Sequence, residues 1–268
     1  MHLIHSLFKK ITSKDSAETY SLVKLDETDS TNGQIRKWAD SHPCAIGQVS
    51  SPIAVLTADY QTAGRGQGEN TWESERGKNL LFSILIHPTS VPLRSQFMLS
   101  MMGALALHEA LRNYLPEGLS LKWPNDIYWN DKKISGTLIE TTILRGHIKD
   151  CVFGVGINVN QMSFSEVLPN PISLCQIVGH EVDRTELLRV VMESFKKYFN
   201  LIEEGGYADI SAMYHESLYR KQGFYAYKDQ DGLFEGAIVE VEDDGHLVLR
   251  DKMDRIRRYA LGDVKFVV

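Results

Sequence analysis

Cysteines and long apolar runs are scarce in this chain of 268 residues. The three cysteines, Cys44, Cys151 and Cys175, are odd in number and show no CxxC spacing, which argues against a disulfide framework and a zinc site. No apolar run reaches the length of a membrane span, and no apolar segment with a small-residue cleavage site marks a signal peptide. We therefore expect free thiols, no membrane anchor and a cytoplasmic location.

A basic surplus is also missing. Lysine and arginine number 29 against 35 acidic residues, which gives a net charge of −6. Proteins that bind bulk DNA usually carry a positive surplus, because phosphate neutralisation dominates their affinity. Hydrophobic residues make up 43 % and charged residues 24 %, as in ordinary globular proteins. The length allows one large domain with a small one beside it.

The apolar patterns predict an α+β fold with a mixed sheet. Strand patterns cover residues 21–27, 53–59, 80–87, 120–123, 126–129, 134–144 and 149–158. Helix patterns begin at residue 30 and cover residues 94–114, 183–203 and 207–219. Four short strand patterns with turns between them follow Gly223 and predict a small barrel-like unit. We expect a lead-in at residues 1–20, a catalytic domain at 21–220 and a small β-barrel at 221–268.

A glycine-rich loop at residues 64–72, GRGQGENTW, is the most informative stretch. Its glycines allow a ligand to approach the backbone and expose amide N–H groups. Arg65 offers a planar fork for a carboxylate or phosphate, and Trp72 could stack on a base or close the loop. The loop lacks the GK[ST] ending of a phosphate-binding loop, and no helix pattern follows it. Taken alone, it is equally well explained as an ordinary surface loop.

A second stretch, KWPND at residues 122–126, is followed by KISG at 133–136. The KWPND stretch combines a cation, an aromatic ring, a fixed backbone angle, an amide and a carboxylate in five residues. Lys133 stands at the start of a strand that would fix its backbone, so it could reach an anionic ligand, whereas Lys132 is expected to be a solvated surface lysine. A third stretch, GVGINVN at 154–160, indicates close backbone packing, although alone it is better explained as a bulged core strand.

Together these stretches resemble the biotin protein ligase family, in the family's order from residue 21 to 160. The matching segments are DSTN at 29–32, QTAGRG at 61–66, NTW at 70–72, KWPND at 122–126, KISG at 133–136 and GINVN at 156–160. The resemblance implies a catalytic domain like that of class II aminoacyl-tRNA synthetases, followed by a small SH3-like barrel.

The resemblance also implies ligand contacts. Biotin contacts are expected at Ser30, Thr31, Asn32, Gln61, Arg65, Gly66, Gln67, Lys133 and Gly136. Nucleotide contacts are expected at Arg65, Asn70, Trp72, Lys122, Asn125 and Asn158. Ser30 is equally well explained as a helix cap. Many family members carry a second arginine where this chain has Gln67, and Glu69 stands where glycine is common, so weaker retention of the adenylate is expected.

The implied reaction joins biotin to ATP and then to one lysine of a carrier protein. We expect Arg65 and Lys133 to hold the biotin carboxylate and the α-phosphate together. Mg²⁺ would neutralise the phosphates, with no protein ligand assigned. Asp126 is a candidate for orienting the acceptor lysine. The expected acceptor is the biotin carboxyl carrier domain of a carboxylase.

Three alternatives remain at this point. A lipoate ligase or octanoyltransferase shares the fold, although the polar residues 30–32 and Gln61 suit the ureido ring of biotin better than a lipoyl tail. A biotin-responsive repressor would need a helix-turn-helix domain, for which the roughly 20 residues before the first strand are too few. A non-catalytic biotin-binding protein would not need both Arg65 and Lys133. No pattern fixes the oligomeric state, and a homodimer through strand edges stays open.

Overall fold

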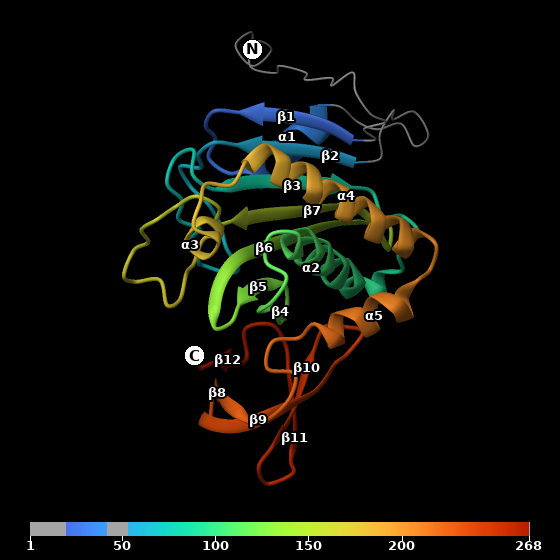
Figure 1. The fold of residues 1–268 in the computed structure, drawn as a ribbon. Coiled ribbons are helices and arrows are strands. Elements are labelled where there is room, and N and C mark those ends of the chain that lie inside the picture. Colours follow the sequence, from blue (N-terminus) through green and yellow to red (C-terminus); the bar gives the residue numbers. More distant parts are fainter. Residues whose placement is uncertain (1–19, 42–52, 268) are drawn as a thin grey trace. The chain divides into compact units, whose positions relative to one another are not determined.

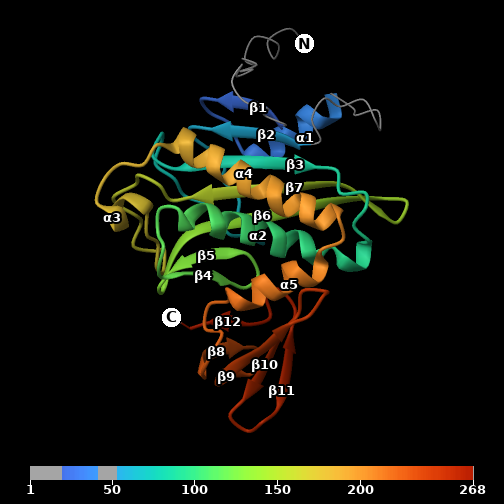
Figure 2. The same cartoon turned by 45° about the vertical axis from the view of Figure 1, so that its right-hand side comes forward.

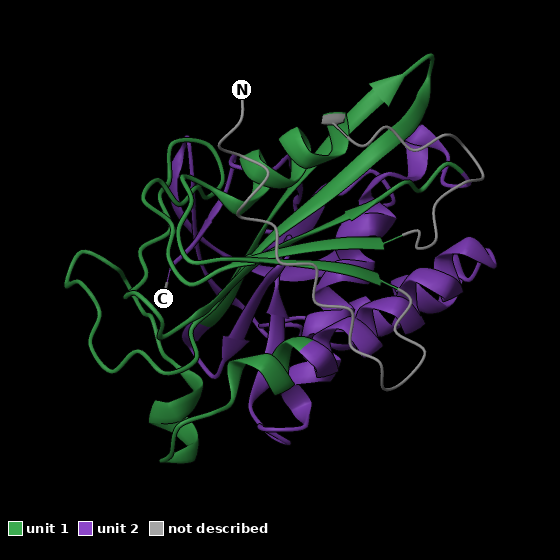
Figure 3. Cartoon of the chain, turned by 90° about the horizontal axis from the view of Figure 1, so that it is seen from above, with its two compact units in different colours: residues 1–89, 134–188 green, residues 90–133, 189–268 purple. Residues whose placement is uncertain are grey.

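The computed structural model describes residues 20–41 and 53–267. It divides into two compact units, the first formed by residues 1–89 and 134–188 and the second by residues 90–133 and 189–268 (Figure 3). Cys44 and all of the predicted lead-in except its last residue, Tyr20, lie outside the described residues. The predicted domain boundary near residue 220 stays a prediction.

The first unit contains a mixed sheet with strands in the order β1-β2-β3-β7-β6. These strands are β1 (Tyr20–Leu25), β2 (Ile53–Ala58), β3 (Leu80–Ile86), β6 (Lys132–Leu144) and β7 (His147–Ile157). Only β1 and β2 are parallel, and the other described pairs are antiparallel. The predicted α+β fold with a mixed sheet is therefore confirmed.

Helix α1 (Thr31–Ser41) covers one face of this sheet, against β2, β3 and β7. Its apolar side carries Ile35, which is 1 % exposed and packs with Leu56, Leu85 and Val152. Burial of this apolar stripe stabilises the helix. It also fixes where the N-terminus of α1 lies above the sheet.

The register of the sheet sets up a row beside that N-terminus. Ser83 of β3 and Leu138 of β6 are both partners of Gly154 on β7. Gly156 pairs with Leu81 on one side and Gly136 on the other. Cross-strand partners point to the same face of a sheet, so these residues form a floor with little side-chain bulk at its centre.

The second unit combines helices with two sets of strands (Figures 1 and 2). Its elements are the 3-10 helix η1 (Leu93–Ser95), α2 (Phe97–Arg112), β4 (Leu119–Lys122), β5 (Asp126–Trp129), α5 (Tyr207–Glu216) and most of α4 (Arg184–Glu203). Helix α2 packs against β4, β5 and α5. No helix among the described residues is long and apolar enough to cross a membrane.

The small β unit predicted after Gly223 is confirmed as a five-stranded antiparallel sheet in the order β11-β10-β9-β8-β12. Its strands are β8 (Tyr225–Asp229), β9 (Gly232–Val241), β10 (Leu247–Asp251), β11 (Ile256–Tyr259) and β12 (Lys265–Phe266). Helix α5 is shorter than the predicted segment 207–219. The short helix α3 (Leu174–Val178) in the first unit was not predicted.

Candidate functional site

The N-terminus of α1 is held by side chains from outside the helix. Gln61 Oε1 accepts the Thr31 N–H at 2.8 Å and lies 3.1 Å from the Thr31 hydroxyl. Asp29 Oδ1 accepts the Ser30 N–H at 2.7 Å, and this bond, with one from the Thr28 hydroxyl, keeps the pKa of Asp29 below its usual range. The Ser30 hydroxyl makes no hydrogen bond within the described residues, so the capping role considered for it is not observed there, and Asp29 and Gln61 instead bind the N–H groups of Ser30 and Thr31.

Asn32 lies over the floor and uses its whole carboxamide. Its Nδ2 donates to Glu140 Oε2 at 2.8 Å and to Leu138 O at 3.3 Å. Its Oδ1 accepts the hydroxyl of Ser83 at 2.6 Å, and that hydroxyl is also 2.8 Å from Thr31 Oγ1. These partners fix the amide orientation, because only Oδ1 can accept. A hydrogen-bond network therefore runs from Gln61 through Thr31 and Ser83 to Asn32.

Glu140 extends this network to two arginines. Its Oε2 lies 3.2 Å from Arg65 Nη2 and 3.8 Å from Arg36 Nη2. The Glu140 side chain is 25 % exposed and that of Arg65 48 %. Arg65 is thus brought next to the same cluster as Asn32, Thr31 and Gln61.

Two glycines make room for this arrangement. A Cβ on Gly154 would lie 2.2 Å from Asn32 Oδ1, and a Cβ on Gly156 would lie 2.3 Å from the Trp72 ring. Both distances are shorter than any van der Waals contact, so only glycine lets Asn32 and Trp72 lie so close to β7. The close backbone packing predicted for the GVGINVN stretch is confirmed, and Gly136 lies beside Gly156 on the same floor.

The glycine-rich loop folds back on itself. Gly66 N–H donates to Asn70 O at 2.7 Å, and Trp72 N–H donates to Gly64 O at 3.0 Å. Asn70 Nδ2 donates to Gln67 O at 2.8 Å and closes the turn. Gln67 and Glu69 are exposed at its tip. The loop therefore presents Arg65 toward Glu140 while its tip faces solvent.

Asn158 is placed at the end of β7, where it joins two segments. It is 4 % exposed. Its Nδ2 donates to Ile172 O at 3.2 Å, and its carbonyl accepts the N–H of Leu174, the first residue of α3. This residue has a clear structural role, and its predicted contact with the nucleotide remains a prediction.

The KWPND stretch and Lys133 belong to the second unit. Lys133 Nζ pairs with Asp126 Oδ2 at 2.7 Å. Trp123 is buried and its Nε1 donates to Gly245 O at 3.0 Å, while Pro124 O accepts the Tyr214 hydroxyl at 2.6 Å. The stretch is therefore anchored on both sides of the half-exposed Asn125.

Lys122 lies among aromatic side chains of the same unit. Its Nζ is 3.1 Å from the Tyr128 hydroxyl. The same atom lies 4.9 Å from the centre of the Tyr128 ring and 5.3 Å from that of Phe266. Cation–π contacts of this kind keep an ammonium in place without neutralising its charge, so Lys122 can still meet an anion.

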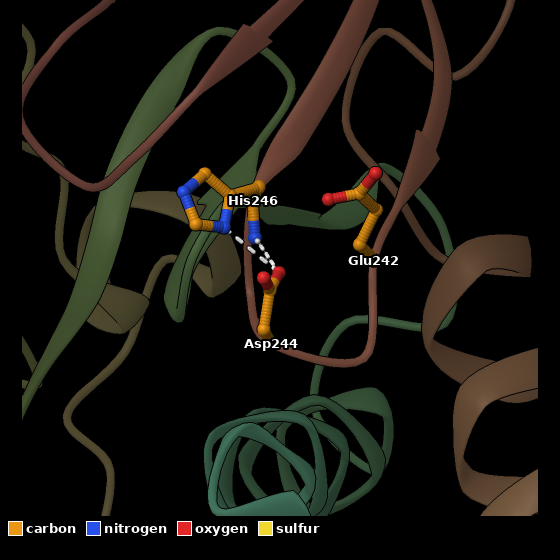
Figure 4. A group of neighbouring side chains, drawn as sticks. All are labelled: Glu242, Asp244 and His246. Atoms are coloured by element: carbon orange, nitrogen blue, oxygen red, sulfur yellow. Dashed lines mark hydrogen bonds and ion pairs between the residues drawn. The ribbon is translucent and has the colours of Figure 1, made fainter. Parts of the chain in front are cut away.

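One group of side chains has the composition of a metal site. Glu242, Asp244 and His246 gather between β9 and β10 (Figure 4). His246 Nδ1 lies 2.8 Å from Asp244 Oδ1, and the guanidinium of Arg258 pairs with both carboxylates. Because this arginine and His246 already pair with the two carboxylates, we assign no metal to the group.

The structure thus brings one set of predicted residues together in the first unit and another in the second. The first set is Thr31, Asn32, Gln61 and Arg65, with Ser30, Gly66, Gln67, Asn70 and Trp72 on the same segments. Gly136 on β6 and Asn158 after β7 belong to the same unit. The second set is Lys133 with Asp126, and Lys122 and Asn125 on the KWPND stretch. Sequence reasoning missed Ser83 and Glu140, which join the first set.

The chain is similar to several known proteins. The sequence profile described as "Biotin/lipoate A/B protein ligase family" matches residues 42–158. The "Bifunctional ligase/repressor BirA" of Bacillus spizizenii is 28 % identical over 214 residues, which cover 79 % of this chain and 65 % of that protein. The chain therefore spans less than two thirds of that relative. The "Biotin--[acetyl-CoA-carboxylase] ligase" of Paracoccus denitrificans is 29 % identical over 244 residues, covering 86 % of this chain and 95 % of that one.

A solved structure is similar along most of the chain. The biotin protein ligase of Aquifex aeolicus in complex with biotin and ATP superposes with a TM-score of 0.74 and 26 % identity, covering 92 % of this chain and 99 % of that one. The protein thus has an α+β fold. Its hydrogen-bonded polar side chains and Arg65 lie beside the glycines of β6 and β7. Residues 42–158 match the biotin/lipoate A/B protein ligase family, and most of the chain is similar to biotin protein ligases in sequence and fold.

Proposed function

We propose that this protein is an ATP-dependent biotin protein ligase. It would convert biotin to biotinoyl-AMP and then transfer biotin to a lysine of a biotin carboxyl carrier domain. The observation that carries the proposal is the network joining Gln61, Thr31, Ser83 and Asn32 to Glu140 and Arg65. Fixed polar groups beside a cation suit a ligand with a polar ring at one end and a carboxylate at the other.

The network suggests how biotin is recognised. Thr31 already occupies Gln61 Oε1, which leaves the Gln61 Nε2 group to donate to the ureido carbonyl. Ser30 offers a hydroxyl with no other partner among the described residues. Both amide protons of Asn32 are used by Glu140 and Leu138, so its proposed contact with biotin would use the second lone pair of Oδ1. Gly66, Gln67, Lys133 and Gly136 complete the proposed biotin contacts.

In the first half-reaction a biotin carboxylate oxygen attacks the α-phosphorus of ATP, and the bond to pyrophosphate breaks. Two anions must meet, so fixed positive charge lowers the barrier. Arg65 and Lys133 are the residues we assign to this role. Their guanidinium and ammonium groups would hold the carboxylate against the α-phosphate and stabilise the charge on its oxygens.

The remaining nucleotide contacts are proposed on the loop and the KWPND stretch. Trp72 would stack on the base, and Lys122 would meet phosphate oxygens. Asn70, Asn125 and Asn158 are the proposed amide contacts. Mg²⁺ would arrive with the phosphates of ATP, since Asp126 is already paired with Lys133 and Mg²⁺ commonly keeps substrate phosphates and water as ligands.

In the second half-reaction the neutral amine of the acceptor lysine attacks the mixed anhydride, and AMP leaves. Asp126 is the candidate for orienting this amine or taking its proton. We further propose a cytoplasmic location, supported by the unpaired and buried thiols of Cys151 and Cys175. Burial raises the pKa of the Cys151 thiol, which keeps it unreactive.

Lipoate is the alternative substrate, because the family description covers both ligands. Isothermal titration with biotin and with lipoate, each with and without a non-hydrolysable ATP analogue, separates the two. We expect micromolar or tighter binding of biotin and no binding of lipoate. Binding of lipoate without biotin would move the protein to the lipoyl branch.

A further inference from the structure

Glu140 is a carboxylate in a site that must bind an anion. Its Oε2 receives the Asn32 amide at 2.8 Å and the Arg65 guanidinium at 3.2 Å. The Arg65 fork is the group we assign to the biotin carboxylate, so the protein's own carboxylate and that of the ligand compete for it. Such competition lowers the affinity for the anionic end of a ligand and leaves the neutral end unaffected.

We propose that Glu140 is a positioning residue that holds Arg65 beside the sheet and releases it when the substrate's anion arrives. This inference rests on the proposed function. The Asn32 amide stays with Glu140 throughout, so the polar network keeps its shape while the arginine changes partner.

Arg36 provides the group that makes this exchange feasible. Its Nη2 already lies 3.8 Å from Glu140 Oε2, and its Nε is buried with no hydrogen-bond partner. When Arg65 turns to the ligand, Arg36 and Asn32 remain beside Glu140. The carboxylate is therefore never left in the site without a cation, which would be costly.

The test compares biotin with biotinamide, its uncharged carboxamide, by titration calorimetry. Glu140→Gln keeps an oxygen that can accept the Asn32 amide but removes the competing charge. We expect the ratio of the two affinities to shift toward biotin by roughly fivefold, the effect of one charge at this range in a partly screened site. Glu193→Gln, which removes an exposed carboxylate paired with Arg189 on α4, should leave the ratio unchanged.

Two further variants change the distance between the carboxylate and Arg65 or remove the second cation, Arg36. Glu140→Asp retains the charge but moves it away from Arg65. It should shift the ratio of the two affinities toward biotin, by less than Glu140→Gln does. Arg36→Met should shift the ratio away from biotin, and this effect should shrink in the double variant with Glu140→Gln.

A purely structural role for Glu140 would weaken both ligands equally. Equal weakening, an unchanged ratio or a shift toward biotinamide in Glu140→Gln would overturn the inference while the proposed function stands. Failure of the unaltered protein to bind biotin at all would overturn both.

Discussion

Lys133 and Asp126 form a close ion pair, with 2.7 Å between Nζ and Oδ2. The side chain of Lys133 is 31 % exposed, so the ammonium is oriented but still reachable. We predict that Lys133→Ala lowers the rate of biotin-dependent pyrophosphate release by about 100-fold or more, the usual effect of removing one group that stabilises transition-state charge.

The neighbouring lysine gives a matched control. Lys132 is exposed at the first position of β6, and Lys132→Ala should keep the full rate. Normal pyrophosphate release by Lys133→Ala would refute the role of Lys133 in adenylation.

Asp126 is assigned to the second half-reaction, which can be isolated by supplying biotinoyl-AMP directly. Asp126→Asn removes the carboxylate that would orient the acceptor amine or take its proton. We predict transfer to the carrier lysine to slow by about 100-fold, within the range of general-base contributions.

Asp131→Asn is the comparison for this variant, because Asp131 lies exposed in the turn after β5 and its carboxylate accepts the Tyr219 hydroxyl. It should transfer biotin at the normal rate. An unchanged transfer rate in Asp126→Asn would dismiss the role of Asp126.

Single residues also show where sequence reasoning stops. The motifs contained Thr31, Asn32, Gln61 and Arg65, because each lies in a local pattern of unusual residues. Glu140 lies in the middle of β6 with no motif of its own. The position of α1 over the sheet places Asn32 beside Glu140, and the fold of the glycine-rich loop places Arg65 there. Such placement depends on contacts between distant parts of the chain.

Strand β7 needs positions without a side chain where Asn32 and Trp72 lie against it. We predict that Gly154→Ala destabilises the protein by about 1–3 kcal/mol, as overpacking of a tight interior does, because its Cβ would lie 2.2 Å from Asn32 Oδ1. The same variant should weaken biotin binding through the displaced Asn32. Denaturant unfolding and calorimetry measure the two effects.

Gly33→Ala is the control for this prediction. Gly33 lies inside α1, and the side-chain atom nearest to the place that a Cβ would take is 4.0 Å away, on Ser30. Alanine favours a helix by up to about 1 kcal/mol over glycine, so this variant should leave the free energy of unfolding unchanged or raise it. Equal stability of Gly154→Ala and the unaltered protein would contradict the role of the glycine floor.

The turn between β10 and β11 is held by Asp251. Burial alone would raise its pKa, but hydrogen bonds from the Arg255 and Met253 N–H groups and from the Arg255 and Arg257 side chains outweigh this and lower the pKa to about 2. A carboxyl whose pKa is lower in the folded state stabilises it above its unfolded pKa of about 3.9. That contribution is lost as the pH falls toward 2.

We therefore predict that Asp251→Asn lowers the melting temperature at pH 7. The difference from the unaltered protein should narrow as the pH falls from about 4 toward 2. Asp243→Asn, at an exposed position, should show no such pattern. A difference that stays constant across this pH range would refute the assigned role of the Asp251 charge.

The elements themselves were largely predictable. Long apolar patterns located α2, α4 and the central strands to within a few residues. Asp183 caps α4 by accepting the Thr185 and Glu186 N–H groups. Helix α3 and strand β12 were missed because five and two residues are too short to show a period. Ser173 and Gln176 form a capping box at α3, and this pair was the sequence signal that could have indicated the start of the helix.

At the scale of the whole molecule, the motifs occur along the chain in an order that one family shares. Their residues divide between the two compact units, with Arg65 in the first and Lys133 in the second. The sequence predicted a set of candidate site residues, whereas the hydrogen-bond network that joins several of them became visible only in the structure. The proposed chemistry needs both of these cations, Arg65 and Lys133.

Mass spectrometry of a biotin carboxyl carrier domain, after incubation with this protein, ATP and biotin or lipoate, tests the proposed ligase activity itself. We expect addition of one biotin to a single lysine, dependent on ATP, and no addition of lipoate. Labelling with lipoate alone, or no labelling although biotin binds, would show that the protein is not a biotin protein ligase.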